Sequence, residues 1–143
     1  MTGSTAGADL LASARVARLA TLDENGQPHV VPVCYATDGR VYYSAIDAKP
    51  KRTSPDRLRR IRNLRARPQV TLLVDHYEED WRQLRFAMVQ GQAEVLGPGS
   101  EAAMALALLQ AKYPQYRAMG LRRLGHPVIR IRPERVLAWS GAA

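Results

Sequence analysis

The chain has 143 residues, of which 46% are hydrophobic and 24% are charged, and its formal net charge is +8. A chain of this length can bury a full core without disulfides or metals, so we expect one domain over residues 1–143, with residues 1–7 flexible. No stretch approaches the ~20 apolar residues that cross a bilayer, and residues 1–7 do not resemble a signal peptide. We therefore expect a cytoplasmic protein with no membrane partner.

Cysteine and histidine usage argues against disulfide and metal chemistry. The single cysteine, Cys34, excludes an internal disulfide, and it has no neighbouring histidine or cation that would activate its thiol. We interpret it as a packing residue rather than a nucleophile. The three histidines, His29, His76 and His126, lack metal-ligand spacing, so no metal is expected.

The first third of the chain predicts a helix followed by a β-hairpin. Apolar residues on one face favour a short amphipathic helix over residues 8–17. Strands over 18–22 and 29–36, joined by the turn residues Asn25-Gly26, form the predicted hairpin. Pro32 cannot donate a ladder hydrogen bond, so it marks either a sheet edge or a break of the kind found beside ligands. Both interpretations stay open here.

The most basic stretch follows a third predicted strand over residues 41–46. Nine of the 21 lysines and arginines lie between Lys49 and Arg67, and a helix predicted from Pro55 to Arg67 carries most of them around an apolar stripe. Unpaired backbone N–H groups at the strand end and the helix start, together with Lys49 and Lys51, favour an anion-binding site.

The second half of the chain predicts two longer strands, a helix and a broken last strand. Alternating apolar residues favour strands over 69–77 and 85–96, with a bend at Gly91. A helix rich in alanine and leucine follows over 100–111, and the last strand is expected to break at Pro133. About six strands in meander order with three or four helices predict a mainly β fold, a small antiparallel β-barrel.

The order of these segments resembles the pyridoxamine-phosphate-oxidase-like split barrels. The likeness rests on the opening helix, the segment from Arg18 to Val33, a strand ending in a Lys-x-Lys turn, and residues 91–95 of the long strand, and it covers about residues 10–139. More narrowly, the chain resembles the branch that depends on the deazaflavin coenzyme F-420. The resemblance implies a six-stranded antiparallel split β-barrel and a homodimer with cofactor sites along the subunit interface.

Members of the family hold a flavin or deazaflavin ring against the second strand and bind its phosphate with basic residues after the third. Transferred to this sequence, the resemblance implies that Pro32 and Val33 lie near the ring and that Ser44 and Ile46 line the pocket. The phosphate would be bound by Lys49 and Lys51 with Arg57 or Arg60, while Trp81 would close the site of the neighbouring subunit.

The arginine-rich helix favours coenzyme F-420 over flavin mononucleotide (FMN), which remains the alternative. Coenzyme F-420 carries a phosphodiester and an oligoglutamate tail, whereas FMN ends in one phosphate. Arginine pairs with carboxylates through two parallel hydrogen bonds, so a row of arginines suits the longer anion. The other interpretation of most of these arginines is a solvated helix face.

The cofactor determines the expected reaction, which is hydride transfer from reduced coenzyme F-420 to an unsaturated small-molecule substrate. Such chemistry requires orientation and exclusion of water rather than a protein acid or base, so no catalytic residue is assigned. A protein that binds coenzyme F-420 or a flavin without turnover is a second possibility. A nucleic-acid partner is not expected, because the basic helix has no interleaved aromatic residues.

Overall fold

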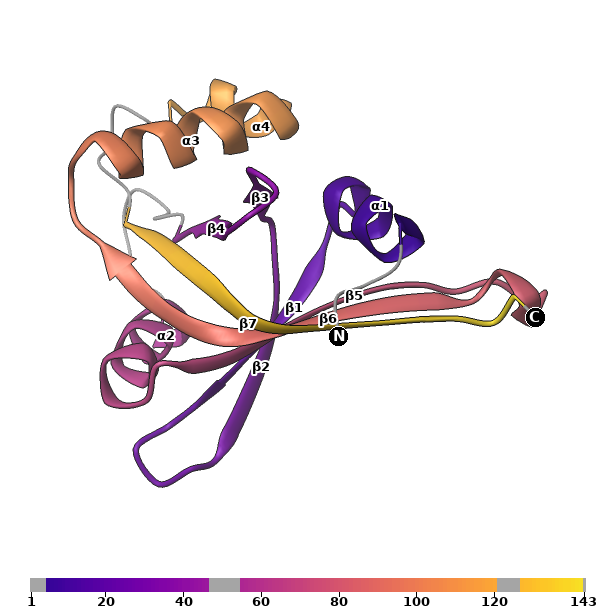
Figure 1. Cartoon of the computed structure of the whole chain (residues 1–143). Coiled ribbons are helices and arrows are strands. Elements are labelled where there is room, and N and C mark those ends of the chain that lie inside the picture. Colours follow the sequence, from indigo (N-terminus) through magenta and orange to yellow (C-terminus); the bar gives the residue numbers. More distant parts are fainter. Residues whose placement is uncertain (1–4, 47–54, 121–126, 143) are drawn as a thin grey trace.

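One antiparallel sheet organises the computed structural model, which describes residues 5–46, 55–120 and 127–142 (Figure 1). Within these ranges the sheet has seven strands in the order β2-β1-β5-β6-β7-β4-β3, and four α-helices accompany it. The strands are β1 (Ala17–Leu22), β2 (Pro28–Val33), β3 (Ala36–Thr37), β4 (Tyr42–Ala45), β5 (Gln69–His76), β6 (Arg85–Leu96) and β7 (Val128–Ser140). The helices are α1 (Thr5–Ser13), α2 (Pro55–Ala66), α3 (Ser100–Lys112) and α4 (Pro114–Ala118), with a 3-10 turn η1 (Trp81–Gln83).

The predicted hairpin of β1 and β2 is confirmed. The Asp23 carboxylate accepts hydrogen bonds from the backbone N–H groups of Asn25 and Gln27, each at 2.8 Å, and Gly26 adopts a φ of 82° that favours glycine. β2 lies at one edge of the sheet, so Pro32 costs no ladder hydrogen bond there. The edge-strand interpretation of Pro32 is therefore correct.

The predicted meander order holds only in part for β4. This strand pairs on one side with the short β3, which includes Ala36 from the end of the predicted second strand. On its other side it pairs with β7, with Ser44 opposite Ile129, and it does not pair with β2. The chain also leaves β2 at Val33, so residues 34–35 form a link rather than the end of the predicted strand. Because β2 and β3 are the two sheet edges and only this link joins them, the edges lie no more than about 11 Å apart there. The sheet therefore curls into a half-barrel.

The last strand runs through Pro133 without the predicted break. The pairing of β6 with β7 shifts register between Gln90 and Gly91, and Gly91 then faces Pro133. A Cβ atom at Gly91 would overlap the backbone carbonyl of Arg132, so glycine is the residue that permits this approach. The irregularity at Gly91 is thus a shift in pairing register, and β7 continues through Pro133.

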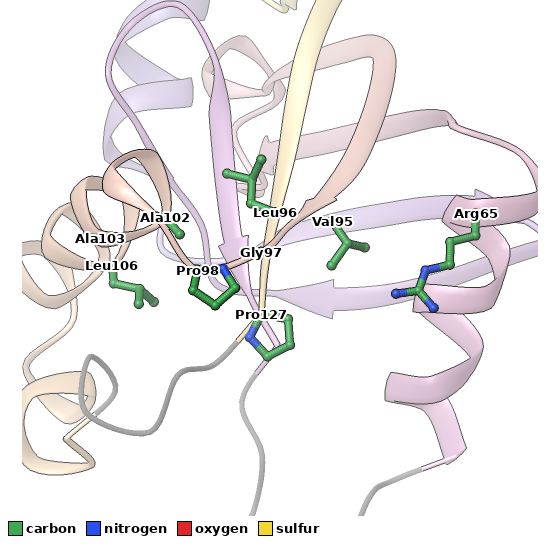
Figure 2. A pocket seen from close by; sticks show the side chains of 10 residues that line it. Arg65, Val95, Leu96, Gly97, Pro98, Ala102, Ala103, Leu106 and Pro127 are labelled. Atoms are coloured by element: carbon green, nitrogen blue, oxygen red, sulfur yellow. The ribbon is translucent and has the colours of Figure 1, made fainter.

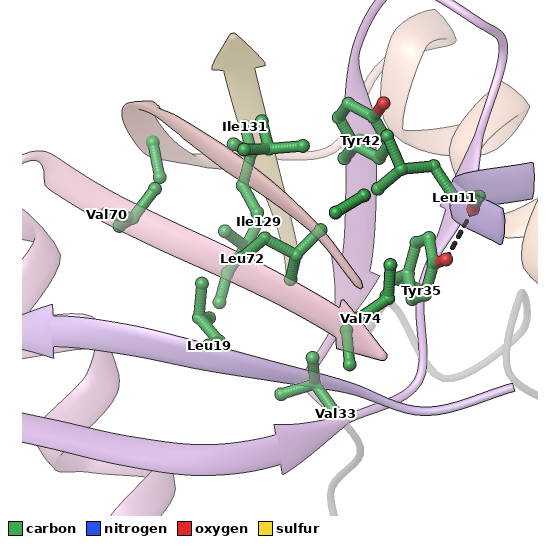
Figure 3. Close-up of a cluster of buried hydrophobic side chains, with 14 of the residues drawn as sticks. Leu11, Leu19, Val33, Tyr35, Tyr42, Val70, Leu72, Val74, Ile129 and Ile131 are labelled. Atoms are coloured by element: carbon green, nitrogen blue, oxygen red, sulfur yellow. Dashed lines mark hydrogen bonds between the residues drawn. The ribbon is translucent and has the colours of Figure 1, made fainter. Parts of the chain in front are cut away.

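Two apolar clusters hold the helices to the sheet. The inner cluster fills the half-barrel with Leu19, Leu72, Val89 and Ile129, and α1 adds Leu10 and Leu11 (Figure 3). The outer cluster packs α3 and α4 against β3 and β4, with contributions from Tyr43, Leu109, Tyr113 and Tyr116. Consecutive residues of β4 thus enter different clusters, so all four of its residues are buried.

Of the predicted helices, the first differs from the structure in its bounds, and the arginine helix is confirmed. The first helix was predicted over residues 8–17 but ends at Ser13, because Ala17 already begins β1. The arginine helix is confirmed as α2, where Leu64 is buried and Ile61 is half-buried against the inner cluster. No helix in the described ranges combines the length and apolarity that a bilayer span requires.

Candidate functional site

A cavity of about 250 Å³ lies where the two sheet edges approach each other. We call it the seam cavity. Its lining residues come from the end of β2 and the link, from β4, and from helices α2 and α4. They are Val16, Pro32, Val33, Cys34, Ser44, Ala45, Arg60 and Tyr116. Four residues of the predicted cofactor site, Pro32, Val33, Ser44 and Arg60, therefore meet in one cavity.

Hydrogen bonds from outside the link hold it in place beside the seam cavity. The Ser44 hydroxyl, 1% exposed, donates to the Cys34 carbonyl at 2.8 Å. The Tyr113 hydroxyl accepts the backbone N–H of Tyr35 at 3.2 Å and donates to the Arg15 carbonyl at 2.9 Å. The Cys34 carbonyl and the Tyr35 N–H, which lie outside the sheet ladder, are thus each paired with a side chain. The wall of the cavity is positioned by these contacts rather than by strand pairing.

Lys112 is the unusual charge behind this wall. Its ammonium donates to the Tyr35 carbonyl at 3.0 Å and lies 3.9 Å from the centroid of the Tyr35 ring. Burial, reinforced by the charge of Arg15, lowers the pKa of Lys112 to about 8, although the face of the tyrosine ring favours the charged form. Burial also raises the pKa of Tyr35, so its hydroxyl stays neutral and donates to the Leu11 carbonyl (Figure 3).

The chemistry of the seam cavity suits a flat, partly apolar ligand with an anionic end. Val16, Pro32, Val33 and Ala45 supply apolar surface, while the half-buried Arg60 supplies a cation. The Ser44 hydroxyl already donates to the Cys34 carbonyl, yet its oxygen keeps lone pairs that accept hydrogen bonds. The lining therefore fits a flavin or deazaflavin ring and does not demand a metal.

The other predicted site residues are not among the described lining residues of this cavity or lie outside the described ranges. Ile46 is fully buried in the inner cluster, and its backbone N–H donates to the Pro127 carbonyl at 2.9 Å. Arg57 belongs to the first half of α2. Lys49 and Lys51 lie outside the described residues, between β4 and α2. Trp81 lies in η1, 68% exposed.

Sequence reasoning missed Val16, Cys34, Ala45 and Tyr116. Cys34 and Ala45 adjoin predicted residues, so a search along the same two strands would have found them. Val16 and Tyr116 arrive through packing between distant segments, and no local pattern indicates that. Cys34 is half-buried and lines the cavity, and it also packs against the outer cluster as expected.

Trp81 marks the tip of an extension that we call the arm, residues 75–86 and 137–141. The outer ends of β5, β6 and β7 run beyond the barrel here, towards the C-terminus in Figure 1. Phe86 and Trp139 stack with their ring centroids 5.9 Å apart, and Tyr77 is 61% exposed. Beside them lies a mostly apolar cavity of about 370 Å³. The arm therefore presents aromatic surface to its surroundings.

Among the described residues, no three or more histidine, cysteine or carboxylate side chains are placed to hold a metal ion. A half-barrel whose two sheet edges approach each other is a split-barrel fold. Residues 5–140 match the pyridoxamine 5'-phosphate oxidase family, and the chain therefore belongs to that family. No match to a curated protein was found.

Solved structures share the fold along nearly the whole chain. A conserved hypothetical protein from Mycobacterium tuberculosis is 24% identical with a TM-score of 0.75, covering 99% of this chain and 87% of its own. A FAD-binding protein from Mesorhizobium loti is 26% identical with a TM-score of 0.69, and the coverage is 95% and 93%. The heme storage protein HutZ from Vibrio cholerae is 20% identical with a TM-score of 0.73, and the coverage is 98% and 95%.

Proposed function

We propose that this protein is a coenzyme F-420-dependent oxidoreductase that reduces an unsaturated organic small molecule. The observation that carries the proposal is the seam cavity, which gathers Pro32, Val33, Ser44 and Arg60 at the end of β4. The basic segment with Lys49 and Lys51 follows β4 directly in the sequence. Reduced deazaflavin supplies a hydride when bound, so the chain has to orient the ring and exclude water.

Each residue expected from the family resemblance has a role in this proposal. Pro32 and Val33 form the apolar wall against the ring, and Ser44 accepts a hydrogen bond from a polar ring atom. Arg60 pairs with an anionic group of the cofactor, with Arg57 as a further cation on the same helix. Lys49 and Lys51 bind the phosphate, and buried Ile46 supports the cavity wall from behind.

Helix α2 favours coenzyme F-420 over FMN as the cofactor. Besides Arg60 it carries Arg59 and Arg62, both of which are exposed, whereas FMN requires one phosphate contact. An oligoglutamate tail places several carboxylates along such a surface. FMN remains the alternative cofactor, because the Mesorhizobium loti neighbour is described as FAD-binding.

We further propose that the protein is a homodimer in which Trp81 closes the seam cavity of the partner subunit. A tryptophan that is 68% exposed at the tip of an aromatic arm is costly to leave in water. Tyr77 and Trp139 add to the same exposed surface. Such a surface fits a partner of the same chain better than it fits solvent.

Cofactor choice is tested by native mass spectrometry of the purified protein mixed with equal amounts of coenzyme F-420, FMN and heme. We expect bound coenzyme F-420. Fluorescence titration of Arg60→Gln should then show affinity weakened about tenfold, as expected for a lost charge-assisted hydrogen bond. Arg40→Gln is the control, since Arg40 is exposed in the turn before β4, away from α2, and does not line the cavity. Predominant FMN or heme binding would reject the proposed cofactor.

Turnover is tested separately from binding. Oxidation of reduced coenzyme F-420 is followed by absorbance while quinones and unsaturated lactones are added in turn. Acceleration by one of these acceptors supports the proposed reaction. Tight binding without acceleration by any acceptor would instead indicate a protein that stores or carries the cofactor.

A further inference from the structure

A second cavity, of about 450 Å³, lies between α2 and α3 and shares no described lining residue with the seam cavity. We call it the interhelical cavity. It is lined by Arg65, Val95, Leu96, Gly97, Pro98, Gly99, Ala102, Ala103, Leu106 and Pro127 (Figure 2). Its volume falls within the range of about 300–1,000 Å³ that is typical of small-molecule sites.

The walls of the interhelical cavity are almost entirely aliphatic. The end of β6 supplies Val95 and Leu96, the first turns of α3 supply Ala102 and Leu106, and Pro127 precedes β7. Among the described lining residues, Arg65 is the one with a polar side chain. Apart from Arg65, the lining side chains offer a ligand no hydrogen bonds, so the cavity favours a ligand that is largely apolar.

Arg65 gives this apolar cavity a single charge. Its side chain extends from the last turn of α2, and the guanidinium is directed towards the cavity on the side of Val95 (Figure 2). Within the described ranges, this guanidinium has no hydrogen-bond or ion-pair partner. Arg67, two residues later, instead donates to the carbonyls of Asp23 and Glu24 at 3.0 and 3.1 Å. The helix dipole favours a cation in the last turn but does not explain its direction.

We propose that the interhelical cavity binds a small amphipathic carboxylate. The apolar part lies between the end of β6 and α3, and the carboxylate pairs with the Arg65 guanidinium through two parallel hydrogen bonds. This inference is independent of the proposed cofactor, because the cofactor residues line the other cavity. It assigns the protein a second ligand of fatty-acid-like chemistry.

The test uses octanoate as the probe, with 1-octanol as its uncharged counterpart, in calorimetric titrations of the full chain. We expect octanoate to bind more tightly than octanol. Ala103→Trp fills the cavity from an exposed helix position and should weaken octanoate binding at least tenfold. Ala107→Trp is the matched control, because Ala107 is exposed on the same helix and does not line the cavity.

The charge is tested with a second pair of variants. Arg65→Gln should weaken octanoate binding about tenfold, so that octanoate no longer binds more tightly than 1-octanol. Arg62→Gln should change neither the affinity for octanoate nor its ratio to the affinity for 1-octanol. Melting temperatures of all four variants check that the fold is intact. Undetectable octanoate binding at millimolar concentration overturns the proposal. The proposal is also overturned if Ala103→Trp binds octanoate as tightly as the native protein does. Competitive displacement of octanoate by coenzyme F-420 or FMN would overturn it as well.

Discussion

Single side chains decide how the link between β2 and β3 is held. Its backbone is bound by Ser44 of β4, by Lys112 at the end of α3 and by Tyr113 between α3 and α4, and no strand partner covers it. Lys112 is the one among these three whose charge changes near neutral pH, because its pKa is lowered to about 8. Stability should therefore depend on pH through this residue.

We expect Lys112→Met to reveal that dependence. The unfolded chain binds more protons than the folded chain between pH 8 and about 10.5, so the stability of the native protein relative to Lys112→Met should rise from pH 7.5 to 9.5. Since Lys112 is only half-buried, the change should be about 1 kcal/mol. Thermal unfolding at several pH values measures it.

Lys112→Arg is the control for this experiment, because arginine stays charged throughout the range. If Lys112 had an ordinary pKa, the difference in stability between the native protein and Lys112→Met would be constant across this pH range. Burial also raises the pKa of Tyr43, to about 12, and desolvation is the main cause. Tyr43 therefore stays protonated in the folded protein throughout these measurements.

Among the secondary-structure elements, the paired strands β6 and β7 carry the most demanding geometry. The register shift at Gln90 and Gly91 brings Gly91 against Arg132 and Pro133. We expect Gly91→Ala to lower the free energy of unfolding by about 3 kcal/mol, because the added methyl group overlaps backbone rather than a movable side chain. Denaturant unfolding monitored by tryptophan fluorescence measures the loss.

Gly97→Ala provides the comparison, since nothing lies within 4 Å of a Cβ atom at Gly97 and its φ is not positive. That variant should unfold within about 0.5 kcal/mol of the native protein. If the two variants were equally stable, β6 and β7 would be able to move apart at Gly91 without any loss in the free energy of unfolding.

The same strands show what a sequence reveals and what it does not. Alternating residues predicted β6 over Arg85–Leu96 with the correct bounds, because a half-buried strand repeats every two residues. The continuation of β7 through Pro133 was missed, because it depends on Gly91 more than forty positions earlier. Likewise, the pattern of β4 identified a strand but could not indicate that β7 is its partner.

The candidate site divides in a similar way. Pro32, Val33, Ser44 and Arg60 were expected from the family resemblance, and they meet in one cavity. Tyr116 could not be predicted, because the packing of α3 and α4 on β4 brings it there. The interhelical cavity had no signal in the sequence, since its aliphatic residues resemble ordinary core residues.

For the whole molecule, the proposed dimer makes a prediction about how two chains share one site. Sedimentation velocity should show a dimer. Trp81→Ala should weaken binding of coenzyme F-420 about tenfold if the indole covers the partner's cofactor. Arg82→Ala, whose guanidinium pairs with Asp80 at 3.0 Å, is the control on the same turn.

Mixing the two site variants separates this arrangement from an indirect effect. A dimer of one Arg60→Gln chain and one Trp81→Ala chain contains one complete site and one site with both changes. Tight binding at half the normal stoichiometry is therefore expected for the mixed dimer once it has been purified after subunit exchange. A shared site is contradicted if the mixed dimer shows no tight binding of coenzyme F-420. It is also contradicted if sedimentation velocity shows a monomer.

The position of β2 at the sheet edge also affects how the protein behaves in concentrated solution. An exposed edge strand can recruit other strands and start aggregation, and Val30 on this edge is 57% exposed. Residues 28, 30 and 32 direct their backbone groups to the same side, and this is the free side, because proline cannot donate to β1. With proline at 28 and 32, β2 offers incoming chains the N–H of Val30 alone. Pro32 thus protects the protein from edge-to-edge association while it lines the seam cavity.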